Sequence, residues 1–324
     1  MQSFIKKTLE LLDGSPEWQE RYSTYLTEIW NHEDKWKKLF HKPEGLSLYT
    51  SVATRNEKFY FLRFKGQNVG KISVNREGEI SLKCLVDESK SHDIKDCPLS
   101  KDVTVDWDSE EATKFREFFN DLPIKTKTKS PEHHVENSLL KEFCKRNGDE
   151  KLICNIQPVV LHGYFFQMPT PLKASKHNPE YSGHNGGGID LMARIRDVKG
   201  HLRLCVCEVK DKNENSESQR DAMSQAVTYA TFIAKLLVTQ PDWWEFFSGH
   251  PKHKGRISNS WDKKHIEVVT MMPAGDTETF DNMELEVPGT DIKLVCRTLY
   301  YDKDIFENEN KFIFSGSFLK EIKQ

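Results

Sequence analysis

The sequence has few features of a cysteine-based site. Its seven cysteines are an odd number, and no two of them are spaced as Cys-x-x-Cys. Structural zinc sites use closely spaced cysteines, and disulfide frameworks use even-numbered sets. We therefore expect neither a structural zinc nor a disulfide framework, and a reducing cytoplasm is the expected location.

Long apolar segments and an excess of charge of one sign are also absent. No run of residues would span a bilayer, and residues 1–12 are too polar for a signal peptide. The 47 lysines and arginines nearly balance the 50 aspartates and glutamates, which gives a net charge of −3. Affinity for nucleic acid would therefore require a local basic patch. A loop with Lys252, Lys254 and Arg256 is one candidate, and it is equally consistent with an ordinary solvated loop.

The length of 324 residues predicts two domains. The basic, polar segment 125–130, which follows Pro123, is the predicted linker between an α+β domain at 1–124 and a second domain at 131–324. The first domain is predicted to hold two helices, a β-meander with glycine-containing turns and a closing helix, over residues 2–13, 16–40, 59–86 and 110–119. Its sequence indicates no role.

The most informative stretch of the second domain predicts an antiparallel hairpin. Residues 189–196 alternate like a strand, and residues 202–210 are nearly all apolar until Glu208. The turn between them is short and contains Gly200. Pairing back from this turn brings Asp190 to the same open end of the hairpin as Glu208 and Lys210.

Two carboxylates and an ammonium at one sheet edge suit a metal site. Oxygen ligands are those that Mg²⁺ and Mn²⁺ prefer, so Asp190 and Glu208 are the predicted ligands, with the Val209 carbonyl as a further one. Lys210 would hold the attacking water or stabilise the phosphorane. The alternative is a surface pair of Glu208 and Lys210, which would contribute little. Both end an apolar strand, where an unpartnered charge is costly, so the site is favoured.

Two helices carry polar residues on their packing faces. The first is predicted over 132–146, and Glu136 falls among its apolar positions, with His133 at the edge of the same face. Glu136 either partners a buried group or extends to solvent, and His133 is a candidate phosphate contact. The second helix is predicted over 218–238, where Gln225 and Tyr229 lie four residues apart on the buried face. Tyr229 is equally consistent with an ordinary core residue, whereas a buried Gln225 needs hydrogen-bond partners.

The order of these motifs over residues 130–275 resembles the PD-(D/E)XK nuclease superfamily, and the Gln-x-x-x-Tyr motif resembles its RecB-like branch. The resemblance implies a restriction-endonuclease-like αβββαβ core, an α/β fold with a mixed sheet flanked by helices. It also implies that Glu136 joins the metal cluster and that Gln225 and Tyr229 line the site. Ile189 replaces the proline of the family name, and the cysteine cluster of iron–sulfur members is missing.

The function implied is a metal-dependent nuclease that hydrolyses phosphodiester bonds in nucleic acid, with DNA as the expected substrate and Mg²⁺ or Mn²⁺ as the cofactor. The alternative is a catalytically inactive nuclease fold that binds nucleic acid or a protein partner. An intact set of Asp190, Glu208 and Lys210 argues against this alternative, because binding alone requires no carboxylates near phosphate. The sequence indicates no membrane partner and no oligomeric state.

Overall fold

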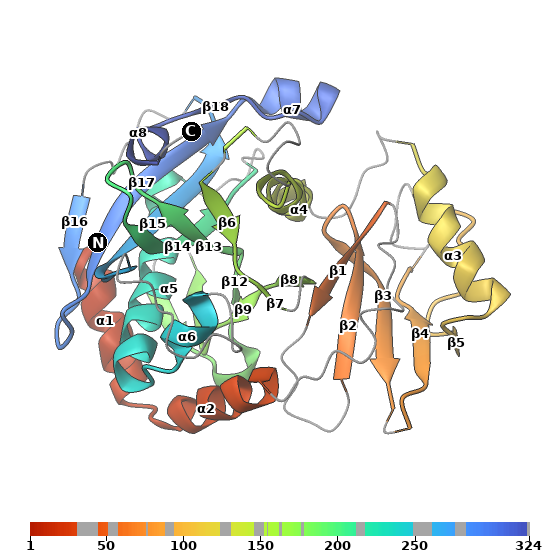
Figure 1. Ribbon diagram of the computed structural model, residues 1–324, viewed down its shortest axis with the longest axis horizontal. Coiled ribbons are helices and arrows are strands. Elements are labelled where there is room, and N and C mark those ends of the chain that lie inside the picture. Colours follow the sequence, from red (N-terminus) through yellow and green to blue (C-terminus); the bar gives the residue numbers. More distant parts are fainter. Residues whose placement is uncertain are drawn as a thin grey trace. The chain divides into compact units, whose positions relative to one another are not determined.

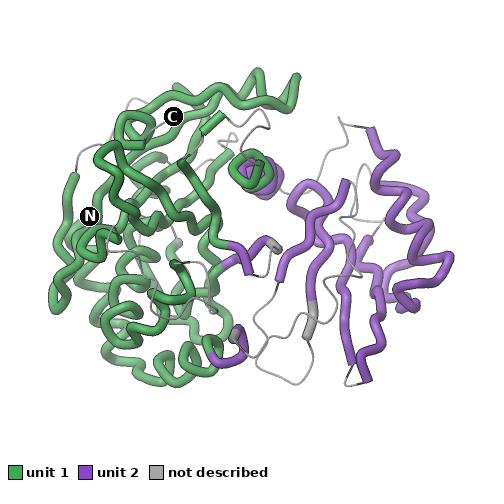
Figure 2. Tube along the Cα trace, in the orientation of Figure 1, with its two compact units in different colours: residues 1–26, 140–159, 168–324 green, residues 27–139, 160–167 purple. Residues whose placement is uncertain are grey.

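The structure, a computed structural model, describes residues 1–30, 45–50, 58–75, 77–87, 94–123, 131–145, 152–153, 155–161, 164–175, 178–211, 218–248, 261–275 and 283–322. Over these residues the chain is a mixed α/β protein with eight α-helices and eighteen β-strands (Figure 1). It forms two compact units (Figure 2). The first unit contains Met1–Leu26, Leu140–Val159 and Met168–Gln324, and the second contains Thr27–Leu139 and Val160–Gln167.

The first unit is built on a seven-stranded mixed sheet. Its β14 (Leu202–Val209) ends in six consecutive buried residues, as expected of a strand covered on both faces. β13 (Leu191–Arg196) pairs with β14 in the predicted antiparallel hairpin, and β15 (Trp261–Pro273) and β17 (Lys293–Tyr301) continue the sheet in parallel. The other strands of this sheet are β6 (Ile156–Pro158), β16 (Met283–Glu286) and β18 (Phe314–Ser315).

Helix α5 (Gln219–Thr239) packs against β14 and β15 and is the predicted second helix. It begins at Ser218, whose side-chain oxygen accepts a hydrogen bond from the backbone N–H of Asp221. Helix α1 (Gln2–Asp13) packs against α5. Its apolar positions recur at helical spacing and are buried, at Ile5, Leu9 and Leu12.

Aromatic side chains join the following helices to the same core. From α2 (Glu17–Trp30), Trp18 and Tyr22 meet Phe232 of α5 edge to face, with ring centroids 5.7 and 4.9 Å apart. Helix α6 (Trp243–Ser248) buries its two tryptophans in the same way. The short elements of this unit are β9 (Met168–Pro169), β10 (Leu172–Ser175), β11 (Asn178–Tyr181), the 3-10 turn Gly183–Asn185, β12 (Gly188–Ile189), α7 (Lys303–Glu309) and α8 (Phe318–Glu321).

The second unit contains the predicted β-meander in a seven-stranded sheet, in which neighbouring strands are antiparallel except for one parallel pair. The order is β5 (Thr104–Asp106), β4 (Ile80–Cys84), β3 (Gln67–Val74), β2 (Lys58–Phe64), β1 (Leu46–Thr50), β8 (Tyr164–Phe166) and β7 (Val160–Leu161). Helix α3 (Glu110–Asp121) packs Phe115 and Phe119 into the same core, and Ser109 caps its start.

The division into units differs from the predicted domain boundaries. Residues 1–26 belong to the unit that holds the C-terminal half, because the apolar face of α1 packs on α5. Helix α4 (Pro131–Phe143), the predicted first core helix, contributes residues 131–139 to the second unit and residues 140–143 to the first. The predicted linker at 125–130 lies outside the described residues.

The αβββαβ order implied by the resemblance places one strand over about residues 152–166, after the first helix, and this expectation is wrong. Three short strands, β6, β7 and β8, occupy this stretch instead, and the last two belong to the sheet of the second unit. Pro158 is the last residue of β6, which lies at the edge of its sheet, where proline is tolerated.

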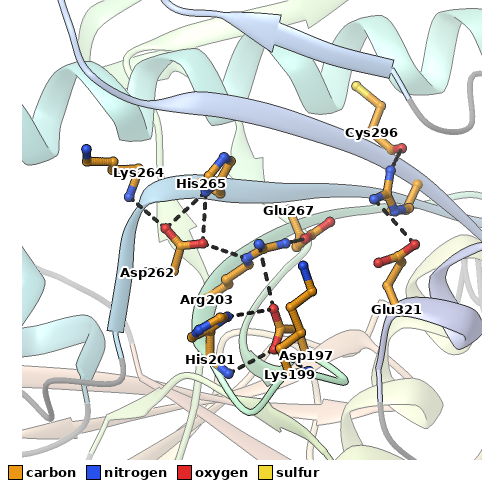
Figure 3. A network of polar contacts seen from close by, with 11 residues as sticks. Asp197, Lys199, His201, Arg203, Asp262, Lys264, His265, Glu267, Cys296 and Glu321 are labelled. Atoms are coloured by element: carbon orange, nitrogen blue, oxygen red, sulfur yellow. Dashed lines mark hydrogen bonds and ion pairs between the residues drawn. The ribbon is translucent and has the colours of Figure 1, made fainter.

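A charged network lies at the turn end of the hairpin, remote along β14 from Glu208 (Figure 3). The guanidinium of Arg203 contacts Asp262 at 2.9 Å, Glu267 at 2.6 Å and Asp197 at 3.6 Å. Asp197 also accepts the backbone N–H groups of the turn at Lys199 and His201, at 2.9 and 2.8 Å. Burial raises the pKa of Glu267 above its ordinary value, although Arg203 and Arg297 oppose the shift.

Replacement of Arg203 by leucine is expected to lower the free energy of unfolding by about 3–5 kcal/mol, because it removes one partner of a buried ion pair. The Glu267 side chain is 0% exposed, so its charge would remain inside without Arg203. Urea unfolding measures the loss. The matched control is Arg196→Ala on the same hairpin, where an exposed side chain donates to the carbonyl of Gly200 at 2.8 Å. Equal losses in the two variants would contradict the assigned role of Arg203.

Candidate metal centre

The hairpin register sets the position of the two predicted metal ligands. Leu191 pairs with Cys207, so Asp190 and Glu208 follow as the next opposed positions at the open end. Opposed residues of an antiparallel pair project from the same face. Asp190 lies between β12 and β13, and its Oδ2 accepts the backbone N–H of Val209 at 2.9 Å. This hydrogen bond ties the Asp190 side chain to the end of β14.

The two carboxylates are close enough to share one ion. Oxygen atoms of Asp190 and Glu208 lie within 4.8 Å of one another. Mg²⁺ takes oxygen ligands at about 2.0–2.1 Å, so two ligands on opposite sides of an ion are roughly 4 Å apart. Glu208 is 1% exposed and Asp190 is partly exposed. The donor set of hard oxygens and its spacing therefore fit a small divalent cation.

Lys210 lies beside these carboxylates with its backbone fixed on both sides. Its N–H donates to the carbonyl of Met271 at 2.9 Å, and its carbonyl accepts the hydroxyl of Tyr301 at 3.1 Å. Its ammonium donates to Oε1 of Glu208 at 2.8 Å, and the residue is buried. Both residues of the pair are buried. The pair is therefore not the surface ion pair that was the alternative interpretation of the sequence.

The glycines before Asp190 permit two close backbone approaches. A Cβ atom on Gly186 would lie 1.9 Å from the carbonyl oxygen of Thr170, and one on Gly187 would lie 2.6 Å from the hydroxyl of Tyr229. Both distances are shorter than non-bonded atoms allow. The glycine run was visible in the sequence, but its contact with Tyr229 was not, since it joins residues 42 positions apart in a loop and a helix.

Tyr229 extends from α5 toward the loop of Gly187, and Gln225 lies one helical turn before it. Tyr229 is buried, and its pKa is raised above its ordinary value by burial and by the carboxylate of Glu208. Its hydroxyl accepts the amide of Gln225 at 3.4 Å. The sequence placed Gln225 on the buried face of the helix, whereas it is only partly buried, because it lies at the edge of that face. Tyr229 is thus close enough to Glu208 and Asp190 for both carboxylates to raise its pKa.

Other predicted site residues lie in the second unit or outside the described residues. Glu136 is buried in the second unit, and its Oε1 lies 3.8 Å from Nη1 of Arg63. His133 of the same helix is exposed. Their roles as metal ligand and phosphate contact stay predictions. The basic residues Lys252, Lys254 and Arg256 lie outside the described residues.

Replacement of Gly187 by alanine is expected to lower the free energy of unfolding by about 1–3 kcal/mol, as overpacking does. The added Cβ would contact the Tyr229 hydroxyl, so removal of that hydroxyl should make room for it. We expect the cost of Gly187→Ala to fall below about 1 kcal/mol in a Tyr229→Phe background. Urea unfolding of the four proteins in this double-mutant cycle checks the contact. An equal cost in both backgrounds would place the strain elsewhere.

Comparisons of the chain with protein-family models, with curated proteins and with solved structures find no match. None of the helices formed by the described residues is both long and apolar enough to cross a lipid bilayer.

Proposed function

We propose that the protein is a metal-dependent nuclease that hydrolyses phosphodiester bonds, with DNA as its substrate. The observation that carries the proposal is the meeting of Asp190, Glu208 and Lys210 at one end of the hairpin. The carboxylate oxygens are within 4.8 Å of one another, and the ammonium is 2.8 Å from Glu208. The two carboxylates can bind a cation, and the ammonium can bind an anionic substrate.

The proposed cofactor is Mg²⁺ or Mn²⁺, held by Asp190 and Glu208, with the carbonyl of Val209 as a further ligand. When bound, such an ion lowers the pKa of a water molecule and neutralises charge on the phosphate. Lys210 would donate its N–H groups to the attacking water or to a phosphate oxygen. Low exposure of Glu208 and Lys210 strengthens these interactions, because little water is present to screen them.

Tyr229 has a narrower role in this proposal. Its raised pKa keeps the hydroxyl protonated at neutral pH, so it can donate a hydrogen bond but cannot serve as a base. Gln225 would orient this hydroxyl through their 3.4 Å contact. Both residues would therefore shape the site rather than exchange protons with substrate.

The arrangement of the first unit supports a restriction-endonuclease-like core. An antiparallel hairpin of β13 and β14 is followed by α5, and β15 then joins β14 in parallel. The proposal assigns Glu136 to the metal cluster on the resemblance alone. Phosphate contacts are proposed for His133 and for the basic residues Lys252, Lys254 and Arg256.

A cleavage assay tests the proposal directly. Plasmid, linear duplex, single-stranded DNA and RNA are incubated with the protein in MgCl₂ or MnCl₂, and in parallel with EDTA. We expect cleavage of DNA that EDTA abolishes. An Asp190→Asn protein purified in the same way controls for contaminating nucleases. Cleavage that resists EDTA and is unchanged in this variant would refute the proposal, as would no cleavage of any of the four substrates with either metal.

A further inference from the structure

Thr270 lies next to Glu208 in the sheet. The parallel pairing of β14 with β15 sets Glu208 opposite Thr270, between the Val206–Val268 pair and the end of the ladder. Side chains at paired positions of neighbouring strands leave the sheet on the same face. The hydroxyl of Thr270 therefore projects from the same face as the predicted metal ligand.

This hydroxyl is buried, and no described residue accepts a hydrogen bond from it. Thr270 is 1% exposed, and its Oγ1 has no hydrogen-bond partner in the part of the chain that the structure describes. The buried threonines of α5 differ, because Thr228 and Thr231 donate to carbonyls of their own helix at 2.9 and 2.7 Å. A strand offers no such carbonyl four residues back. A valine of nearly the same shape would fill this position without burying an unsatisfied group.

We infer that Thr270 is a positioning residue for Glu208, whose carboxylate receives the Thr270 hydroxyl as a hydrogen-bond donor when a divalent cation is bound. The inference rests on the proposed function. Oε1 of Glu208 accepts the ammonium of Lys210. A cation between Asp190 and Glu208 would compete with that ammonium and turn it toward substrate. The neighbouring hydroxyl would then hold the Glu208 carboxylate in its liganding orientation.

The expected size of the effect on metal affinity comes from the contribution that comparable hydrogen bonds make at other metal sites. Groups that hydrogen-bond a metal-ligating side chain typically change metal affinity or activity about 10–100-fold when removed. A hydroxyl donor suits the task because it adds no charge and leaves the carboxylate negative. The same hydroxyl would contribute nothing to the metal-free protein, where it has no partner among the described residues.

The test is the affinity of the full-length protein for Mn²⁺, measured by isothermal titration calorimetry without substrate. Thr270→Val should weaken Mn²⁺ binding about tenfold or more. Thr270→Ser, which restores the hydroxyl, should bind close to wild type. Thr231→Val is the matched control, since it removes a buried hydroxyl that bonds within α5, and it should leave the affinity unchanged. The melting temperature without metal should be the same or higher in Thr270→Val, which shows that the variant folds.

The outcomes separate this inference from the proposed function. Mn²⁺ affinity of Thr270→Val within twofold of wild type overturns the inference, even where the wild-type protein cleaves DNA. Weaker binding that serine restores supports the inference, even where the wild-type protein cleaves nothing and the proposed nuclease function fails. A wild-type protein that binds no Mn²⁺ overturns both.

Discussion

Lys210→Ala is expected to lower the cleavage rate by about 10²–10³-fold or more while leaving the affinity for Mg²⁺ or Mn²⁺ at least as strong as in wild type. The ammonium donates to Glu208 at 2.8 Å and so competes with a cation for that carboxylate. Without it, this competition for Glu208 is removed, but the site loses the charge that would orient the water or the phosphate. Loss of a single preorganised donor typically costs about 10²–10³-fold in rate. Single-turnover cleavage with saturating metal measures this effect separately from substrate binding.

The same variant has a stability signature that depends on metal. The Lys210 side chain is 9% exposed and that of Glu208 is 1% exposed, so the substitution removes one partner of a buried pair. We expect the metal-free protein to lose about 3–5 kcal/mol, and added Mg²⁺ to restore part of that loss. Lys173→Ala, on an exposed side chain of β10, is the control. Cleavage by Lys210→Ala within tenfold of wild type would exclude the proposed role.

Asp190→Asn is expected to abolish both cleavage and divalent-ion binding. The substitution keeps the shape of the side chain and an oxygen that can accept the Val209 N–H, which lies 2.9 Å from Oδ2. It removes the negative charge that a divalent ion requires from one of only two proposed side-chain ligands in the first unit. Calorimetric titration with Mn²⁺ and cleavage of plasmid DNA test the two losses independently.

Without metal, the Asp190→Asn variant should be at least as stable as wild type, although it loses activity. Oxygens of Asp190 and Glu208 lie within 4.8 Å of one another, and like charges at this distance repel. Removal of one charge should leave the metal-free melting temperature unchanged or raise it. Asp242→Asn, at an exposed position before α6, controls for a general effect of charge removal. Intact Mn²⁺ binding by Asp190→Asn would rule out this carboxylate as a ligand.

The parts of the site that were predictable depend on local patterns. The apolar run that ends at Glu208, the glycine turn and the alternating strand before it fix the hairpin and its register, because pairing counts outward from the turn. Helix α5 was predictable from its capping serine and its apolar spacing. Asp190, Glu208 and Lys210 were therefore placed together without any information from distant parts of the chain.

The parts that were not predictable depend on which surfaces meet. The amphipathic pattern of α1 indicates a buried face but not that α5 covers it. Thr270 gave no signal, since threonine is an ordinary residue in a strand and its role depends on its neighbour in β14. Gln225 is partly exposed because it lies at the edge of the buried face of α5. Residue spacing alone does not distinguish the edge of a helix face from its centre, so this exposure was not predictable.

The pairing of α1 with α5 has a consequence for how the chain is made. Synthesis delivers α5 about 200 residues after α1, which at roughly 5–20 residues per second is a delay of about 10–40 s. During that interval the side chains of Ile5, Leu9 and Leu12 are already outside the ribosome, while α5, the helix that covers them, has not yet been synthesised. A chain released near residue 125 would expose this apolar stripe permanently, and we expect such a fragment to aggregate or to bind chaperones. Residues 1–26 therefore depend on the C-terminal half of the chain for the surface that buries the apolar face of α1.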